Sequence, residues 1–118
     1  MSKRIVWYKV YDFSLHGAEP QQLNSARTID IEGKRLCLAR TVEGYFAIDD
    51  KCPHAGARFG MGGWCDNGLV VCPVHRYKYE AKTGKGLQGD FVETYPTELR
   101  ADGVYVGLKS DKPRWWPF

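Results

Sequence analysis

Two short runs of cysteine and histidine constrain this chain more than any other feature. The first is Cys52-Pro53-His54, and the second, after a gap of 17 residues, is Cys72-Pro73-Val74-His75. Each run supplies one soft thiolate and one imidazole from a single loop. We therefore interpret Cys52, His54, Cys72 and His75 as the four ligands of one metal centre, and any fold of this chain must bring the two runs together.

Zinc is the first alternative, because two cysteines and two histidines fill a tetrahedral structural site, usually with two to four residues between paired ligands. Cys52 and His54 are separated by only one residue, and side chains at that spacing diverge along an extended backbone. A two-iron, two-sulfur cluster removes the difficulty if the two cysteines hold one iron and the two histidines hold the other. The spacing favours this cluster, with a zinc-stabilised binding module and a chance scatter of Cys and His as the alternatives.

The ligand pattern resembles the signature of Rieske proteins. Further similarity lies upstream in 44–50, in Ala55-Gly56-Ala57 after the first ligands, and downstream in Tyr79 and Thr83-Gly84. The likeness weakens only over the last ten residues. It implies one Rieske [2Fe-2S] domain over residues 1–118, with a cluster-binding subdomain at about 50–90.

Short runs rich in β-branched and aromatic residues, separated by turn residues, predict an all-β domain built as a small antiparallel sandwich or partly open barrel. We expect a helical turn only at 19–24. The expected strands are 5–11, 27–31, 35–42, 45–48, 69–72, 94–99 and 104–108.

Length and composition narrow the class of Rieske protein. At 118 residues the chain has room for one domain, whereas the resemblance implies a much larger catalytic domain in a terminal oxygenase. No apolar stretch approaches the roughly 20 residues needed to span a bilayer. In respiratory relatives each ligand loop carries an extra cysteine, and the two cysteines form a disulfide that braces the cluster. In this chain Ala57 and Val74 stand at those two places. We expect no membrane anchor, no bracing disulfide and a cytoplasmic location.

Three further cysteine and histidine residues have simpler interpretations. Cys37 lies in a strand-like run and is expected to be a buried core thiol. Cys65 follows a glycine-rich stretch, and we expect it near a loop tip, outside the metal centre. His16 is expected at the surface.

Tyr79 is a candidate for tuning the cluster. In high-potential Rieske proteins, by resemblance, an aromatic hydroxyl four residues past the second histidine donates to a cysteine sulfur. The alternative is that Tyr79 is a packing residue with its hydroxyl in solvent.

Arg76 stands where Rieske proteins often have a glycine directly after the second histidine. Basic residues near the ligands can steer an acidic partner, and the alternative is a mixed solvated surface. The net charge of +3 is too small to indicate nucleic-acid binding.

The aromatic tail Trp115-Trp116-Pro117-Phe118 is expected to pack back onto the domain, with a docking site for a partner or second subunit as the alternative.

The resemblance as a whole implies a one-electron carrier, not a catalyst by itself. It implies a flavin-containing NAD(P)H reductase as donor and a terminal oxygenase as acceptor, both transient partners. The alternative is the small subunit of an NADH-dependent nitrite reductase complex.

Overall fold

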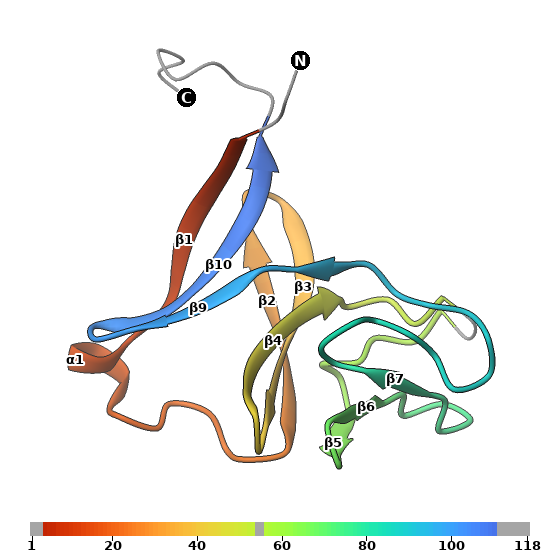
Figure 1. Cartoon of the computed structure of the whole chain (residues 1–118). Coiled ribbons are helices and arrows are strands. Elements are labelled where there is room, and N and C mark those ends of the chain that lie inside the picture. Colours follow the sequence, from red (N-terminus) through yellow and green to blue (C-terminus); the bar gives the residue numbers. More distant parts are fainter. Residues whose placement is uncertain (1–3, 54–55, 111–118) are drawn as a thin grey trace.

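The computed structural model describes residues 4–53 and 56–110, whose regular structure is almost entirely strand. One antiparallel sheet has the order β1 (Arg4–Asp12), β10 (Gly103–Ser110), β9 (Thr97–Arg100). The other has the order β7 (Lys78–Glu80), β6 (Leu69–Val71), β5 (Trp64–Asp66), β2 (Ser25–Ile31), β3 (Lys34–Thr41), β4 (Gly44–Asp49), β8 (Thr94–Tyr95). The longer sheet curls into part of a barrel, which confirms the predicted all-β architecture (Figure 1).

Strand β3 is buried on both of its faces and divides the core in two. Leu36 and Leu38 point into a cluster shared with Val104 and Val106 of β10. Cys37 and Ala39 point the other way, into a cluster that contains the cysteines of both ligand runs. Since side chains alternate between the faces of a strand, one apolar run can serve both clusters. The predicted metal centre therefore belongs to the half of the core away from β1, β9 and β10 (Figure 1).

The chain passes from one sheet to the other at Pro96, within the single strand predicted over 94–99. Tyr95 in β8 pairs with Ala47 of β4, whereas Thr97 in β9 pairs with Val106 of β10. Proline has no N–H to donate to a ladder, so it suits the point where pairing changes partner. Its carbonyl still accepts a hydrogen bond from the N–H of Gly107 at 2.8 Å. The predicted single strand is therefore wrong, and the break ties the two sheets together.

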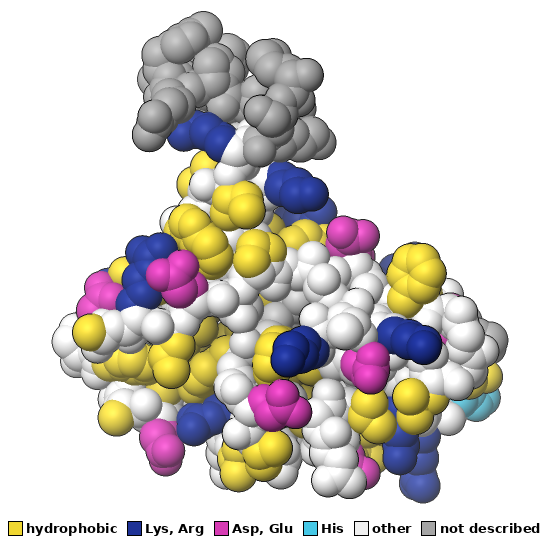
Figure 2. All heavy atoms as spheres, viewed as in Figure 1, with side chains coloured by type: hydrophobic (Ala, Val, Ile, Leu, Met, Phe, Trp, Pro, Cys, Tyr) yellow, Lys and Arg dark blue, Asp and Glu magenta, His cyan; other side chains and the backbone are white. Residues whose placement is uncertain are grey.

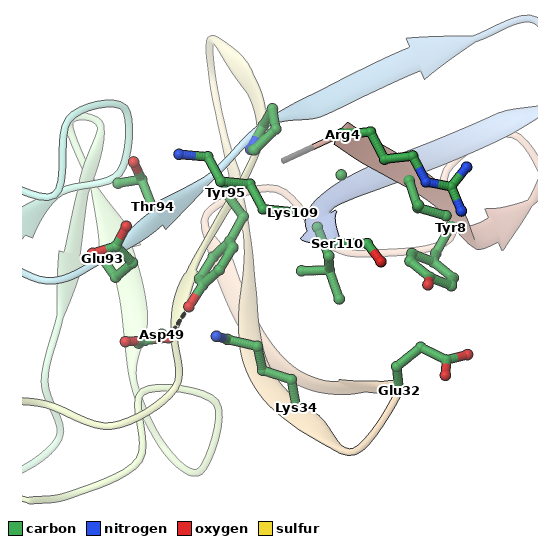
Figure 3. A pocket seen from close by; sticks show the side chains of 14 residues that line it. Arg4, Tyr8, Glu32, Lys34, Asp49, Glu93, Thr94, Tyr95, Lys109 and Ser110 are labelled. Carbon is green, nitrogen blue, oxygen red and sulfur yellow. Dashed lines mark hydrogen bonds between the residues drawn. The ribbon is translucent and has the colours of Figure 1, made fainter. Parts of the chain in front are cut away.

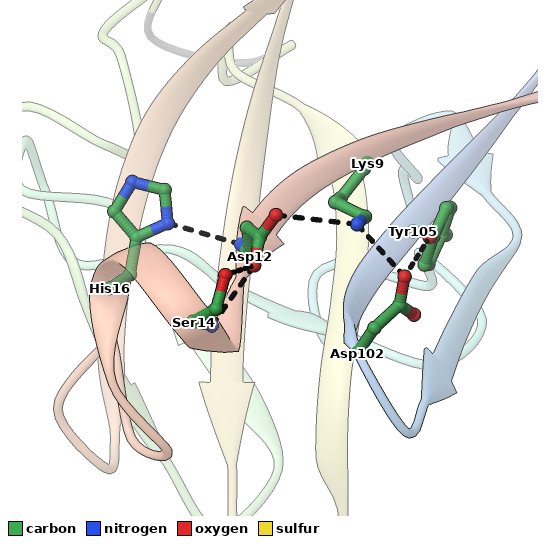
Figure 4. A network of polar contacts seen from close by, with 6 residues as sticks. All are labelled: Lys9, Asp12, Ser14, His16, Asp102 and Tyr105. Carbon is green, nitrogen blue, oxygen red and sulfur yellow. Dashed lines mark hydrogen bonds and ion pairs between the residues drawn. The ribbon is translucent and has the colours of Figure 1, made fainter.

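The short helix α1 (Phe13–His16) follows β1 directly (Figure 4). Asp12 caps it by accepting hydrogen bonds from the N–H of Ser14 at 2.9 Å and from its hydroxyl at 2.6 Å. Gly17 ends it with φ at +86°, a value that suits glycine. His16 is exposed, and its Nδ1 accepts from the Asp12 N–H at 3.1 Å, so the prediction of a surface histidine is confirmed.

The helical turn predicted at 19–24 is wrong. Gln21 is buried there, and its amide Nε2 donates to the carbonyl of Leu38 at 2.8 Å. The guanidinium of Arg40 donates to the Gln21 carbonyl at 2.9 Å. These contacts with β3 hold the segment against the sheet and replace the hydrogen bonds that a helix would form. Within residues 4–53 and 56–110, no helix has the length and apolar character to cross a bilayer.

Strands β5, β6 and β7 lie between β4 and β8 in sequence and extend the longer sheet past β2 (Figure 1). The join is narrow, since β2 and β5 share one residue pair, Ser25 with Trp64. The N–H of Cys65 adds a hydrogen bond to the carbonyl of Asn24 at 2.9 Å. The strand predicted at 69–72 corresponds to β6, whereas β5 and β7 were not predicted. The second ligand loop lies between β6 and β7, and the first lies between β4 and β5.

Candidate metal centre

Two loops of the same form carry the predicted ligands. In the first, the N–H of Cys52 donates to the carbonyl of Ala57 at 2.7 Å. In the second, the N–H of Cys72 donates to the carbonyl of Tyr77 at 2.8 Å. Each loop is thus closed from its cysteine to the fifth residue beyond it. The two cysteines occupy equivalent positions, although the ligand runs differ by one residue in length.

The structure brings Cys52 and Cys72 together in the core. Both are fully buried, and both are free thiols. Burial raises the pKa of the Cys72 thiol, a hydrogen bond from the backbone of Val74 partly lowers it, and the adjacent Cys52 side chain raises it again. Two neighbouring thiolates repel each other in a low-dielectric core unless a cation lies between them. This pair of thiols fits the cysteine end of an iron–sulfur cluster.

His75, three residues after Cys72, is exposed at the surface. Its backbone φ is +61°, and that of Arg76 is +58°, so two consecutive non-glycine residues adopt the left-handed conformation. Such residues are uncommon and cluster at functional loops. The His75 ring lies 6.1 Å from that of Tyr77 in an edge-to-face arrangement. His54 lies outside the described residues, so its predicted role stays a prediction.

The donor set fits a Rieske-type [2Fe-2S] cluster. Thiolates are the usual ligands of iron–sulfur clusters, and imidazoles replace two of them in the Rieske type. Cys52 and Cys72 supply buried thiols from two equivalent loops, and His75 supplies an exposed imidazole from the second. A buried sulfur end and a solvent-facing imidazole are both present in the described part of the site.

Tyr79, in β7, contacts the candidate ligand Cys52. Its hydroxyl oxygen lies 3.6 Å from the Cys52 sulfur, and it donates to Oδ2 of Asp90 at 2.7 Å. The ring is fully buried and packs edge-to-face on Phe59 with centroids 5.4 Å apart. Burial, followed by Asp90 and Cys52, raises the pKa of the phenol above its usual value. The hydroxyl lies beside a cysteine sulfur, but the predicted donation to that sulfur stays a prediction, because Asp90 is the nearer acceptor. The alternative with the hydroxyl in solvent is wrong.

Asp50 supports the first loop, a role that the sequence analysis did not identify. The carboxylate is 2% exposed and accepts from Thr28 Oγ1 at 2.9 Å, Arg58 Nε at 2.9 Å and the Gly60 N–H at 2.8 Å. Its carbonyl accepts from the N–H of Phe59 at 2.7 Å. A signal was available, because the carboxylate follows β4 directly and precedes the first ligand by two residues.

The two remaining cysteines lie in the core. Cys37 is fully buried in β3, as predicted. Cys65 was expected near a loop tip, and that prediction is wrong. It lies in β5 with 4% of its surface exposed, and its thiol donates to the carbonyl of Ser25 at 3.3 Å. Burial raises the pKa of this thiol to about 11.

Charges of both signs surround the loops. Arg58 pairs with the buried Asp50, and Lys78 lies 3.9 Å from Asp66. Figure 2 shows basic, acidic and hydrophobic side chains interspersed over the visible face. On this face the mixed surface describes the molecule better than a continuous basic patch.

A cavity of about 910 Å³ lies apart from the ligand loops, between the three-stranded sheet and the edge of the longer one (Figure 3). Arg4, Glu32, Lys34 and Asp49 line it with charges of both signs. The hydroxyl of Tyr95 donates to Asp49 at one side of the cavity. In the part of the chain that the structure describes, its lining contains no cysteine or histidine, so the candidate ligands belong to a different site.

Comparisons with known proteins agree with a Rieske-type cluster as the cofactor. Residues 11–97, which include both ligand loops, match the family model of the Rieske [2Fe-2S] domain. A 3-phenylpropionate/cinnamic acid dioxygenase ferredoxin subunit from Photorhabdus laumondii is 32% identical over 71 residues, covering 58% of this chain and 68% of the relative.

Solved structures share the fold. A carbazole 1,9a-dioxygenase complex of reduced oxygenase and oxidized ferredoxin contains a chain with a TM-score of 0.70 and 24% identity, covering 85% of this chain and 91% of that one. A protein described as an NADH-dependent nitrite reductase small subunit, from Mycobacterium tuberculosis, has a TM-score of 0.73 and 19% identity, covering 89% and 96%. At these identities the structural likeness shows the fold alone.

Proposed function

This chain belongs to the Rieske [2Fe-2S] domain family, and from that premise we propose that it is a one-electron carrier, not a catalyst by itself. The observation that supports this most directly is the pair of buried thiols, Cys52 and Cys72, at equivalent positions of two matching loops. When bound, the cluster accepts and returns one electron. We further propose that residues 1–118 form one domain with its cluster-binding subdomain at about 50–90.

Each ligand has a distinct role in this proposal. Cys52 and Cys72 would bind one iron, and their burial would keep water from the sulfur end. His54 and His75 would bind the other iron. His75 is exposed, so its imidazole edge offers a short route between the centre and a partner at the surface. Neutral imidazoles in place of two thiolates also reduce the negative charge at the centre and raise its potential.

Anaerobic purification followed by analysis of iron, acid-labile sulfide and zinc tests the cofactor and its ligands. We expect iron and sulfide in the ratio of a [2Fe-2S] cluster, and an electron paramagnetic resonance spectrum of the reduced protein with the low average g value of histidine ligation. Cys72→Ser should lose the cluster, whereas the matched control Cys65→Ser should retain it. Stoichiometric zinc without iron would contradict the proposal.

For partners, we propose a flavin-containing NAD(P)H reductase as electron donor and a terminal oxygenase as acceptor. The Photorhabdus relative is described as the ferredoxin subunit of a dioxygenase, and the carbazole complex joins a ferredoxin to an oxygenase. Reduced protein mixed with a terminal oxygenase should be reoxidised in a rapid, saturable reaction. The four free thiols also suit a reducing compartment such as the cytoplasm.

The nitrite reductase alternative has structural support in the Mycobacterium tuberculosis neighbour. Purification from the native host distinguishes the two functions. A stable complex with a large sirohaem subunit would favour the alternative. Recovery as a separate protein that undergoes reversible one-electron reduction would favour the carrier.

A further inference from the structure

The hydroxyl of Tyr79 lies between two acceptors but has one proton to donate. One acceptor is Asp90 Oδ2 at 2.7 Å, and the other is the Cys52 sulfur at 3.6 Å. Tyr79 is fully buried, so water does not compete for this proton. When Cys52 binds iron, its sulfur carries no proton, and any hydrogen bond between the two must come from Tyr79. The choice between carboxylate and sulfur then decides how much the hydroxyl stabilises the cluster.

Distance and chemistry both direct the proton to Asp90. Hydrogen bonds from a hydroxyl to an ionised carboxylate are typically 2.5–2.7 Å long and about twice as strong as neutral ones. The contact of Tyr79 with Asp90, at 2.7 Å, falls at that length. The contact with sulfur, at 3.6 Å, is longer partly because sulfur is the larger atom, and it has no comparable shortening. The carboxylate therefore outcompetes the sulfur, and Cys52 receives little from the phenol.

The carboxylate is held in this position by its own loop. The N–H of Gly86 donates to the Asp90 carbonyl at 2.7 Å, and Gln88 Nε2 donates to Asp90 Oδ1. Gly86 forms a bridge with Tyr79, so the loop is anchored to β7 beside the phenol. A Cβ at Gly86 would collide with the Asp90 side chain and carbonyl, which shows how closely the loop is packed. The arrangement is built from several contacts and does not depend on one side-chain rotamer.

We propose that Asp90 lowers the reduction potential of the centre by drawing the Tyr79 proton away from the Cys52 sulfur. This inference rests on the proposed Rieske cluster. Hydrogen bonds to ligand sulfurs stabilise the more negative, reduced state, so withholding one favours the oxidised state. Reduction of a bound cluster by the proposed reductase would add one electron and transfer no proton, so the proton would stay on Tyr79. Asp90 is thus a positioning residue that acts through the phenol, and its negative charge adds in the same direction.

A double-mutant cycle on the midpoint potential separates the two effects. We expect Asp90→Asn to favour reduction by about tenfold, which is about 59 mV for one electron, because the phenol can then donate to sulfur. Tyr79→Phe alone should change the equilibrium constant for reduction by less than about threefold, since the wild-type proton is held by Asp90. In the double variant, most of the rise in midpoint potential caused by Asp90→Asn should disappear.

Asp66→Asn is the matched control, because it removes the same charge from the same subdomain without touching Tyr79. It should leave the potential nearly unchanged. If Asp90→Asn raises the midpoint potential equally whether residue 79 is tyrosine or phenylalanine, only the charge of Asp90 acts, and the proposal is overturned. A tenfold loss of reduction in Tyr79→Phe alone would overturn it too, because the wild-type proton would then be on sulfur.

The Tyr79→Phe comparison keeps the test decisive if Asp90→Asn does not fold. Resonance Raman spectra provide a second readout, since a hydroxyl bonded to sulfur makes iron–sulfur stretches sensitive to deuterium. We expect wild type and Tyr79→Phe to show the same deuterium shift, and a larger one in Asp90→Asn. Iron and sulfide analysis of each variant separates this inference from the proposed function. If all variants contain the cluster and the changes in midpoint potential of the two single variants simply add in the double variant, only the inference is refuted. If the wild-type protein contains no cluster, the proposed function is refuted.

Discussion

Arg58 donates from Nε to the carboxylate of Asp50 at 2.9 Å, and this ion pair closes the base of the first ligand loop. The two partners differ in environment, because the Asp50 side chain is 2% exposed and that of Arg58 is 36% exposed. The carboxylate also accepts from Thr28 in β2 and from the N–H of Gly60. Asp50 therefore links the strand that precedes Cys52 to the segment that follows the loop.

Asp50→Ala should destabilise the protein by about 3 kcal/mol, because it leaves buried donors without their charged acceptor. Asp50→Asn should cost about half as much, since the amide oxygen can still accept. Denaturant unfolding of the apo and cluster-loaded forms measures both values. Asp30→Ala is the control, since Asp30 pairs with Arg35 at the exposed surface and should change stability by less than about 0.5 kcal/mol. Equal effects at positions 50 and 30 would contradict this role.

Gly60 lies against β2, where a side chain has no space. A Cβ there would collide with the backbone and the hydroxyl of Thr28, the residue whose hydroxyl donates to Asp50. We expect Gly60→Ala to lower the unfolding free energy by about 3 kcal/mol through overpacking. Gly33 in the β2–β3 turn has φ at +77° and nothing within 4 Å of its Cβ position, so Gly33→Ala should cost about 1 kcal/mol from backbone strain alone. Equilibrium unfolding measures both losses of unfolding free energy. If Gly60→Ala loses no more than Gly33→Ala, β2 moves to make room for the added methyl group.

Removal of iron should loosen the ligand loops and leave the other half of the fold intact. Cys52 and Cys72 belong to one core cluster, whereas Val104 and Val106 belong to the other, across β3. Since metal-binding energy contributes to the order of the segments that hold the metal, only the first half depends on it. Hydrogen exchange of the N–H groups of Cys52 and Cys72 should accelerate by at least about tenfold on chelation, with little change in β10. Uniform acceleration would show that the halves unfold together.

The parts of the fold that sequence predicted are those with local signals. Cys52 and Cys72 were found from their spacing, and β3 was found from its apolar run. The failures depend on distant partners. Gln21 is held against β3 by hydrogen bonds with Leu38 and Arg40, so its local helical preference is overridden.

The same reason explains what was missed in the site. Asp90 lies 11 residues beyond Tyr79, and nothing in the intervening sequence shows that the loop returns to the phenol. Cys65 follows glycines and a tryptophan that suggest a loop tip, yet pairing with β6 places it in a strand whose cysteine is part of the core. Contacts across the sheet decide these positions, and they have no signature at the residues concerned.

The thiols of Cys37 and Cys65 should resist alkylation in the folded protein. Cys37 is fully buried, and burial raises its pKa well above the usual value. The pKa of Cys65, at about 11, leaves only about one thousandth of this thiol as the reactive thiolate at pH 8. Iodoacetamide at pH 8, followed by mass spectrometry of peptides, should find both unmodified in native protein and fully modified after unfolding in denaturant. A variant with a surface cysteine, Ser14→Cys, supplies the control and should react within minutes. Labelling of Cys65 at the rate of that control would mean that β5 separates readily from β2, which the hydrogen bond from its thiol to Ser25 argues against.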